Sequence, residues 1–303
     1  MKNNFVEWYL NKQARHKKSV FLTADLGYNA LEKIQSRMKE RFINVGVCEQ
    51  NMIGVAAGLA RKGFFPTCYS MVPFIILRSL EQIRNDICFN NLNVKLIGLG
   101  GGYGYGIMGP SHHSIEDLAV VTSLPHLRTF IPCNDGDVHS VLENAYKFQG
   151  PSYLRLTTTP DSNGIDLPKF QAMRKLTIGN ELTLIALGPS ANRAFQAVTQ
   201  QSSIVNKIEM FVCSELPLKK IPSAIRKSIL KTKNVLCIEE HVARGGMSEH
   251  LAWHLMNQGL QCQFKSITAQ TYFTDSNGDH NHLLKQFKLD VFAIQEEISK
   301  CLR

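Results

Sequence analysis

The first half of the chain alternates short apolar runs with longer amphipathic stretches. The short runs are rich in β-branched residues and have the length of strands, and the stretches between them have the hydrophobic spacing of helices. This alternation is typical of an α/β fold, in which helices flank a mainly parallel sheet. The expected strands are Val20–Thr23, Phe42–Val45, Phe65–Tyr69, Val94–Leu99, Arg128–Ile131 and Tyr153–Leu156, and the expected helices are Asn51–Arg61, Phe74–Phe89, Ile115–Ser123 and Gly136–Phe148.

The periodicity stops between Thr157 and Pro168, where proline, glycine and other turn-forming residues gather. Such a segment is typical of a linker, so we expect one domain over residues 1–165 and a second over residues 166–303. Beyond the linker the pattern restarts, which predicts a smaller α/β domain of the same kind. Its expected strands are Leu182–Leu187, Lys207–Cys213 and Val235–Glu239, with helices after Gly188 and Gly246 and a polar loop over residues 274–282.

Composition narrows the class of protein. The chain has 303 residues, of which 44% are hydrophobic, and this is enough for two domains with substantial cores. Residues 1–18 lack the apolar core of a signal peptide. No apolar run approaches the roughly 20 residues of a spanning helix, so we expect a cytoplasmic protein with no membrane partner.

Charge and cysteine usage exclude two further classes. The net charge of +9 suits an anionic ligand, but lysine and arginine are spread along the chain. Nucleic-acid-binding proteins gather such residues into a basic patch, so we expect no nucleic acid partner. The eight cysteines include no C-x-x-C pair, which indicates neither a zinc site nor a disulfide framework.

The most informative segment runs from Arg41 to Ala60 and reads R-F-I-N-V-G-V-C-E-Q-N-M-I-G-V-A-A-G-L-A. The expected strand ends by Gly46, a short turn follows, and Glu49 falls in the first turn of the expected helix. A carboxylate at this position commonly does no more than interact favourably with the helix dipole. Spacing alone therefore favours a structural role for Glu49 over a catalytic one.

This segment resembles the glutamate motif of the transketolase family, whose pattern is roughly R-x-x-x-x-G-(I/V)-x-E-Q-x-M. The resemblance continues through E-Q-I-R-N at Glu81, L-N-V-K at Leu92 and G-P-S-H-H-S-I-E-D-L at Gly109. It covers essentially the whole chain, in the order of a pyrimidine-binding domain followed by a transketolase C-terminal domain. It implies a transferase that uses thiamine diphosphate to move a two-carbon ketol, or a related acyl-anion unit, to an aldehyde or ketone.

The resemblance also implies roles for particular residues. Glu49 would share a proton with N1′ of the cofactor's aminopyrimidine, which favours the imino tautomer that activates the thiazolium C2. Gln50 would lie beside the cofactor and Phe74 would stack on its pyrimidine, although a core position explains Phe74 equally well. His112 would move protons on substrate oxygens, because imidazole titrates near neutrality. His113 would line the substrate side, with a purely structural histidine as the alternative.

The loop from Gly100 to Gly109 departs from the family. Its sequence, G-G-G-Y-G-Y-G-I-M-G, lacks the helix and the ribose-binding acid of a dinucleotide fingerprint. In transketolases this loop carries a histidine and an acidic pair that bind ketose hydroxyls, and Gly100, Ile107 and Met108 stand there instead. Arg155 matches an arginine that grips a phosphate. We therefore expect a sugar or sugar-phosphate substrate other than an ordinary pentose phosphate.

The G-D-G motif with which transketolases hold Mg²⁺ and the diphosphate is absent. The resemblance thus implies an alpha-type partner subunit that carries the diphosphate-binding domain and the Mg²⁺, in an α2β2 assembly, and no metal on this chain. Two alternatives stay open. One is a 2-oxoacid decarboxylating component, such as a dehydrogenase beta subunit or half of a deoxyxylulose phosphate synthase, and the other is a catalytically silent scaffold subunit, against which Glu49 and His112 count.

Overall fold

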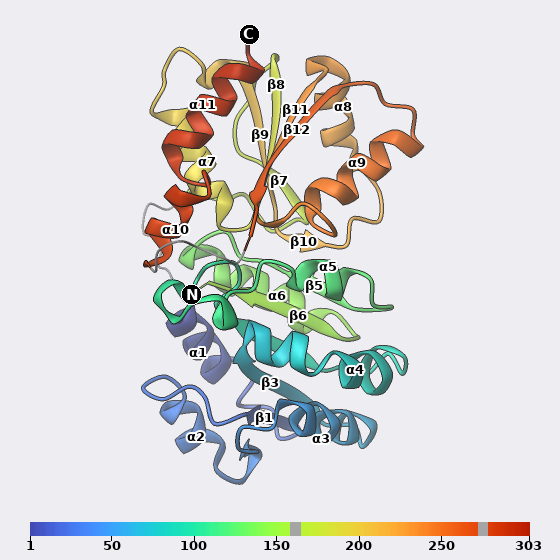
Figure 1. Ribbon diagram of the computed structural model, residues 1–303. Coiled ribbons are helices and arrows are strands. Elements are labelled where there is room, and N and C mark those ends of the chain that lie inside the picture. The colour runs from blue at the N-terminus through green and yellow to red at the C-terminus, as the bar shows by residue number, and fades with distance from the viewer. Residues whose placement is uncertain (158–164, 272–277) are drawn as a thin grey trace.

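The structure is a computed structural model of the chain and describes residues 1–157, 165–271 and 278–303. Two α/β units lie one above the other, the N-terminal unit drawn from blue to green and the C-terminal unit from yellow to red (Figure 1). The expected fold class, two consecutive α/β units with mainly parallel sheets, is confirmed. The linker around residue 165 joins the last strand of the first unit to the first strand of the second, and residues 158–164 of it lie outside the described part of the chain.

A seven-stranded sheet forms the first unit, with the strand order β10-β5-β6-β4-β3-β1-β2. Neighbouring strands run parallel except at the edge, where β10 is antiparallel to β5. Because β10 follows β9 in the chain, the second unit contributes an edge strand to the first sheet. The strands are β1 (Ser19–Thr23), β2 (Phe42–Asn44), β3 (Phe65–Met71), β4 (Lys95–Leu99), β5 (Arg128–Phe130), β6 (Ser152–Leu156) and β10 (Glu215–Leu216).

Alternation along these strands sends side chains into two hydrophobic layers, one on each face of the sheet. In β1, Val20 and Leu22 join the layer that α3 covers, whereas Phe21 joins the layer that α1 covers. Full burial of a side chain such as Phe21 stabilises the fold by about 1.5–3 kcal/mol. The helices are α1 (Lys2–Asn11), α2 (Glu32–Met38), α3 (Glu49–Arg61), α4 (Leu80–Gln82), α5 (Asp117–Thr122) and α6 (Val138–Lys147).

The second unit has a five-stranded sheet with the order β12-β11-β8-β9-β7, in which β7 alone is antiparallel to its neighbour. Its core is built on β8, every residue of which is buried. The strands are β7 (Met173–Lys175), β8 (Leu182–Leu187), β9 (Ile208–Cys213), β11 (Asn234–Val242) and β12 (Gln263–Ala269), and the helices are α7 (Ser190–Thr199), α8 (Ser223–Thr232), α9 (Met247–Asn257), α10 (His280–Gln286) and α11 (Val291–Cys301).

Two sequence expectations need correction. The helix expected over Phe74–Phe89 is two π-helical turns, Pro73–Arg78 and Ile83–Cys88, on either side of α4. Hydrophobic spacing cannot separate an α-helix from a π-turn in so short a run, and π-turns frequently lie at functional sites. The polar loop expected over residues 274–282 is wrong at its end, because α10 begins at His280. The Asp279 side chain accepts the His282 backbone N–H there and caps the helix; residues 272–277 lie outside the description.

Candidate active site

Glu49 opens α3 directly after the turn that leaves β2. Gly46 in that turn has a φ of +75°, a backbone conformation that favours glycine. The Glu49 side chain is only 1% exposed. Its Oε1 faces Ser70 Oγ near the carboxyl end of β3, at 3.4 Å, and its Oε2 accepts a hydrogen bond of 2.7 Å from Arg78 Nη1. A charged pair at a helix N-terminus accounts for this buried carboxylate, because both the guanidinium and the dipole favour its negative charge.

Arg78 was not among the residues expected from the sequence. It shares the π-helical turn Pro73–Arg78 with Phe74, and its guanidinium carbon lies 4.5 Å from the centroid of the Phe74 ring. The wider π-turn brings residues at this spacing onto one side of the helix. A single arginine inside the apolar run P-F-I-I-L-R was the available signal. Arg78 thus joins the carboxylate of Glu49 to the aromatic face of Phe74.

His112 meets Phe74 from another segment of the chain. The two ring centroids are 5.4 Å apart and the rings are nearly perpendicular. His112 Nδ1 lies 3.0 Å from Ser111 Oγ, and the Tyr105 ring is 6.2 Å away on a further side. The structure therefore brings Glu49, Phe74 and His112 into one cluster, as the sequence leads us to expect of a site.

The loop after β4 is shaped by Gly100 and Tyr105. Gly100 has a φ of +87°, and a Cβ atom there would lie 2.1 Å from the Tyr105 ring. Burial raises the pKa of Tyr105 to about 12, so its hydroxyl stays protonated. Ile107 and Met108 follow on the surface, 73% and 52% exposed. An aromatic ring and two apolar side chains thus stand in the loop where transketolases are expected to carry polar groups.

Comparison with known proteins decides the family. Two family models match, the transketolase pyrimidine binding domain over residues 7–159 and the transketolase C-terminal domain over residues 171–294. The chain belongs to the transketolase family. It is 30% identical over 262 residues to an apulose-4-phosphate transketolase subunit of Actinobacillus succinogenes, a match that covers 84% of this chain and 83% of the relative. Transketolases are thiamine-diphosphate-dependent transferases, so the expected family and enzyme class are confirmed.

Two further relatives span nearly the whole chain. A putative transketolase C-terminal section from Methanocaldococcus jannaschii is 30% identical over 309 residues, 98% of this chain and 95% of its own. A solved split gene transketolase, described as an inactive beta4 tetramer, has a TM-score of 0.87 at 27% identity and covers 99% of this chain and 97% of its own. The homologous apulose-4-phosphate transketolase subunits are parts of split transketolases, and this chain is of that type.

His113 lies apart from the Glu49 cluster of this transketolase chain. Its side chain is buried, and its Nε2 is 3.0 Å from the Gly106 carbonyl oxygen. Its ring edge meets Tyr103 at 5.3 Å between centroids. Burial lowers the pKa of His113, which favours the neutral ring that donates Nε2–H to Gly106. The structure thus gives His113 the structural position that stood as the alternative to a substrate contact.

Arg155 is also placed differently from the expectation of a phosphate-gripping side chain. Its guanidinium is buried between the two units, where Asp117 accepts hydrogen bonds from Nε at 2.8 Å and Nη2 at 3.2 Å. The Ser114 and Glu240 carbonyl oxygens also accept from Nη2. A buried guanidinium needs a buried carboxylate beside it, and Asp117 fills that need here. The arginine therefore joins the units instead of facing the Glu49 cluster.

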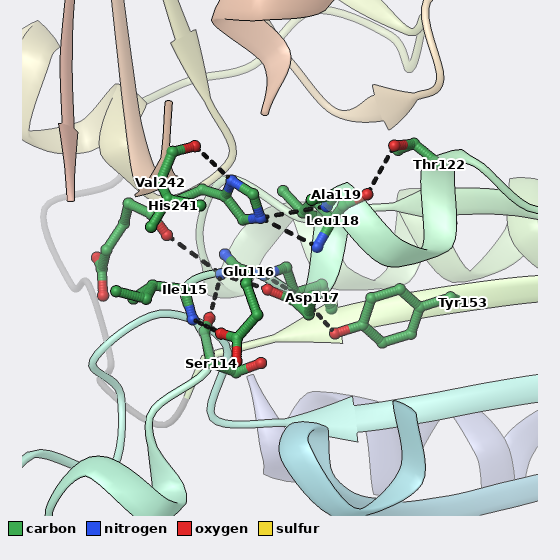
Figure 2. A network of polar contacts seen from close by, with 12 residues as sticks. Ser114, Ile115, Glu116, Asp117, Leu118, Ala119, Thr122, Tyr153, His241 and Val242 are labelled. Atoms are coloured by element: carbon green, nitrogen blue, oxygen red, sulfur yellow. Dashed lines mark hydrogen bonds and ion pairs between the residues drawn. The ribbon is translucent and has the colours of Figure 1, made fainter. Parts of the chain in front are cut away.

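The same junction contains His241 of β11, shown with Asp117 and Tyr153 in Figure 2. His241 Nε2 accepts the backbone N–H groups of Leu118 and Ala119 at 3.1 and 3.3 Å, in the first turn of α5. His241 Nδ1–H donates to the Val242 carbonyl at 2.7 Å. Burial lowers the pKa of His241, which keeps Nε2 free to accept. A neutral imidazole of the second unit therefore caps a helix of the first.

Glu240 holds the loop of Gly100 to the second unit. Its Oε1 accepts the Tyr103 backbone N–H at 2.7 Å and lies 2.8 Å from His280 Nε2, and its Oε2 accepts from Arg193 at 3.0 Å. Although burial opposes it, His280 and Arg193 hold the pKa of Glu240 well below its usual range. The second unit thus fixes the start of the loop that leads to His112.

Metal and membrane features are limited. Among the residues described, no three His, Cys, Asp or Glu side chains gather as a metal site would require. That part of the chain also has no helix of sufficient length and apolar character to cross a membrane.

Proposed function

We propose that this chain supplies the pyrimidine half of the cofactor site of a split transketolase. The observation that supports this most directly is the convergence of a buried carboxylate, an aromatic ring and an imidazole from Glu49, Phe74 and His112. They come from three segments near the loops that follow parallel strands, the usual place for a ligand in such sheets. The proposed reaction moves a two-carbon ketol, or a related acyl-anion unit, to the carbonyl carbon of a sugar-like acceptor.

The side chains fit the aminopyrimidine of thiamine diphosphate. When bound, the cofactor supplies a nucleophilic carbon that carries the two-carbon unit. Glu49 would hold the N1′ edge of the pyrimidine and exchange a proton with it. Phe74 would cover a ring face and exclude water, and His112, on the edge of Phe74, would hold or move a proton at a substrate oxygen. Gln50, exposed in the first turn of α3, stays a proposed neighbour of the cofactor.

The loop of Gly100 favours an acceptor unlike the usual ketoses. Tyr105 fills the space beside Gly100, and Met108 presents an apolar side chain at the rim. Substrate hydroxyls that lose polar partners bind less well, so this loop selects against a substrate that needs them. The similarity to an apulose-4-phosphate transketolase subunit makes apulose 4-phosphate the first substrate to test.

The diphosphate and its Mg²⁺ belong, in this proposal, to an alpha-type partner subunit in an α2β2 assembly in the cytoplasm. Two facts support the partner: this sequence has no G-D-G motif, and its relative from Actinobacillus succinogenes is named as one subunit of a transketolase. Oxygen ligands suited to Mg²⁺ then come from the other polypeptide.

Calorimetry with thiamine diphosphate and Mg²⁺ tests the shared site. Binding is expected in the complex that the chain forms with its partner in its native cells, and not in the chain alone. The Glu49→Gln variant should keep the complex assembled but lose at least about a hundredfold in ketol transfer, because the general acid–base contribution is removed. Glu81→Gln, an exposed carboxylate near the same site, is the control. Full activity of Glu49→Gln would instead indicate a scaffold subunit.

The 2-oxoacid reaction is distinguished by its product. A decarboxylating component releases CO₂ when a 2-oxoacid is supplied, whereas a transketolase transfers a ketol unit without CO₂. The proposed function expects transfer without CO₂ in the assembled complex, and stoichiometric CO₂ release would replace it with the decarboxylating alternative.

A further inference from the structure

Arg78 makes both contacts that the proposed function gives to the aminopyrimidine. Its Nη1 donates to Glu49 Oε2 at 2.7 Å, as a protonated N1′ edge would. Its flat guanidinium lies over the Phe74 ring, 4.5 Å from the centroid, as a stacked pyrimidine would. A planar cation with hydrogen-bond donors therefore occupies the position between carboxylate and ring that a planar heterocycle would take.

The exposure of the two partners shows which of them must move. Glu49 is 1% exposed, so no ligand ring can reach its carboxylate while Arg78 lies on it. The Arg78 side chain is 43% exposed, and among the described residues its guanidinium makes polar or ring contacts with Glu49 and Phe74 alone. A long side chain with an open path to solvent can leave, whereas Glu49 is fixed in the first turn of α3.

We propose that Arg78 occupies the pyrimidine position of the chain without cofactor and leaves Glu49 when the cofactor binds. This inference rests on the proposed function, because it concerns the same site. In the absence of cofactor, Arg78 compensates a buried carboxylate that would otherwise be unpaired and costly. Cofactor binding is then a competition, and the affinity measured for the cofactor is lowered by the ion pair that has to break.

Removing the guanidinium tests the competition. Arg78→Ala is compared with Arg84→Ala, an exposed arginine on the following turn, in the complex with the partner subunit. Binding of thiamine diphosphate with Mg²⁺ is measured by calorimetry. Arg78→Ala is expected to bind about tenfold more tightly than the wild type, because the hydrogen bond to a charged group no longer has to be broken. Arg84→Ala should bind as the wild type does.

Weaker or unchanged binding by Arg78→Ala would overturn the inference, since Arg78 would then support the bound cofactor or play no part. If Arg78→Ala does not assemble, Arg78→Lys takes its place. The lysine retains the charge but loses the planar group, so we expect binding tighter than wild type by a smaller factor, and weaker or unchanged binding overturns the inference again. Absence of binding by the wild-type complex would instead reject the proposed function, and this inference with it.

Discussion

Arg155 and Asp117 form a two-point ion pair in the buried junction between the units, with Nε–Oδ2 and Nη2–Oδ1 distances of 2.8 and 3.2 Å. Both side chains are at most 5% exposed. The Tyr153 hydroxyl donates to the same Asp117 Oδ2 at 2.8 Å. The pair therefore connects the end of β6 with the start of α5, close to the second unit.

Replacing Arg155 by methionine should destabilise the chain by about 3 kcal/mol or more, because Asp117 would remain as an unpaired buried carboxylate. Chemical denaturation of the variant, compared with the exposed-arginine variant Arg37→Met, measures this. No selective rise in the KM for a phosphorylated acceptor is expected. Unchanged stability with a raised KM would return Arg155 to the substrate-binding role expected from the sequence.

His241 should make stability depend on mild acid. Burial lowers the folded-state pKa of His241, so the neutral form is favoured in the native state and the unfolded state takes up the proton first. Its contribution is fully present above the unfolded pKa of about 6.5 and is lost as the pH falls towards the folded value. His241→Gln, which retains an acceptor, should reduce the slope of unfolding free energy between pH 8 and pH 5, set here as about the range around that pKa. His139→Gln, an exposed histidine, should leave the slope unchanged.

Lys95 predicts the opposite dependence. Its ammonium group donates to the Phe148 and Gly150 carbonyls and to Ser152 Oγ, without a carboxylate, and burial lowers its pKa to about 7. Since the unfolded chain keeps the proton up to about pH 10.4, Lys95 adds stability as the pH rises above 7, by at most roughly 1.4 kcal/mol per pH unit. Lys95→Met should remove this rise in denaturation experiments, and exposed Lys17→Met should not. A rise equal in all three proteins would assign it to other groups.

Gly100 and Tyr105 should be energetically coupled. Gly100→Ala adds a methyl group that would lie 2.1 Å from the Tyr105 ring, at a φ of +87°. We expect a loss of about 1–3 kcal/mol in unfolding free energy from strain alone, and more from the contact. In the double variant with Tyr105→Ala, the contact part should be recovered and the φ part should remain. Strict additivity in this double-mutant cycle would show that Tyr105 is not the obstacle.

The sequence predicts the strands of the first sheet well because they are buried apolar runs bounded by turns. It misses β12, whose side chains are largely exposed, and β10, which has two residues, since neither forms an apolar run. Helix α10 is missed because its polar residues continue the polar segment before it. Burial against other parts of the chain, which a local pattern does not contain, decides these elements.

The candidate site shows a similar division. Glu49, Phe74 and His112 are found because they belong to motifs with fixed spacing, and the structure brings them together. Arg78 is missed because its partners are set by a π-turn and by a residue 29 positions away. Arg155 has a recognisable motif, but its neighbour Asp117 determines that it is buried in an ion pair. Motif spacing identifies the residue type, whereas the three-dimensional neighbours determine what it contacts.

The two-residue strand β10 limits how far the halves of this chain can exist apart. It pairs with β5 at the edge of the first sheet, so a fragment ending in the linker would present the bare backbone of β5 to solvent and to other chains. The hydrophobic layer that contains Leu216 and Ile131 would be opened at the same place. The units are thus recognisable as modules in sequence but are not autonomous in folding, and exchange of one half between related enzymes has to carry β10 along with the sheet that it completes.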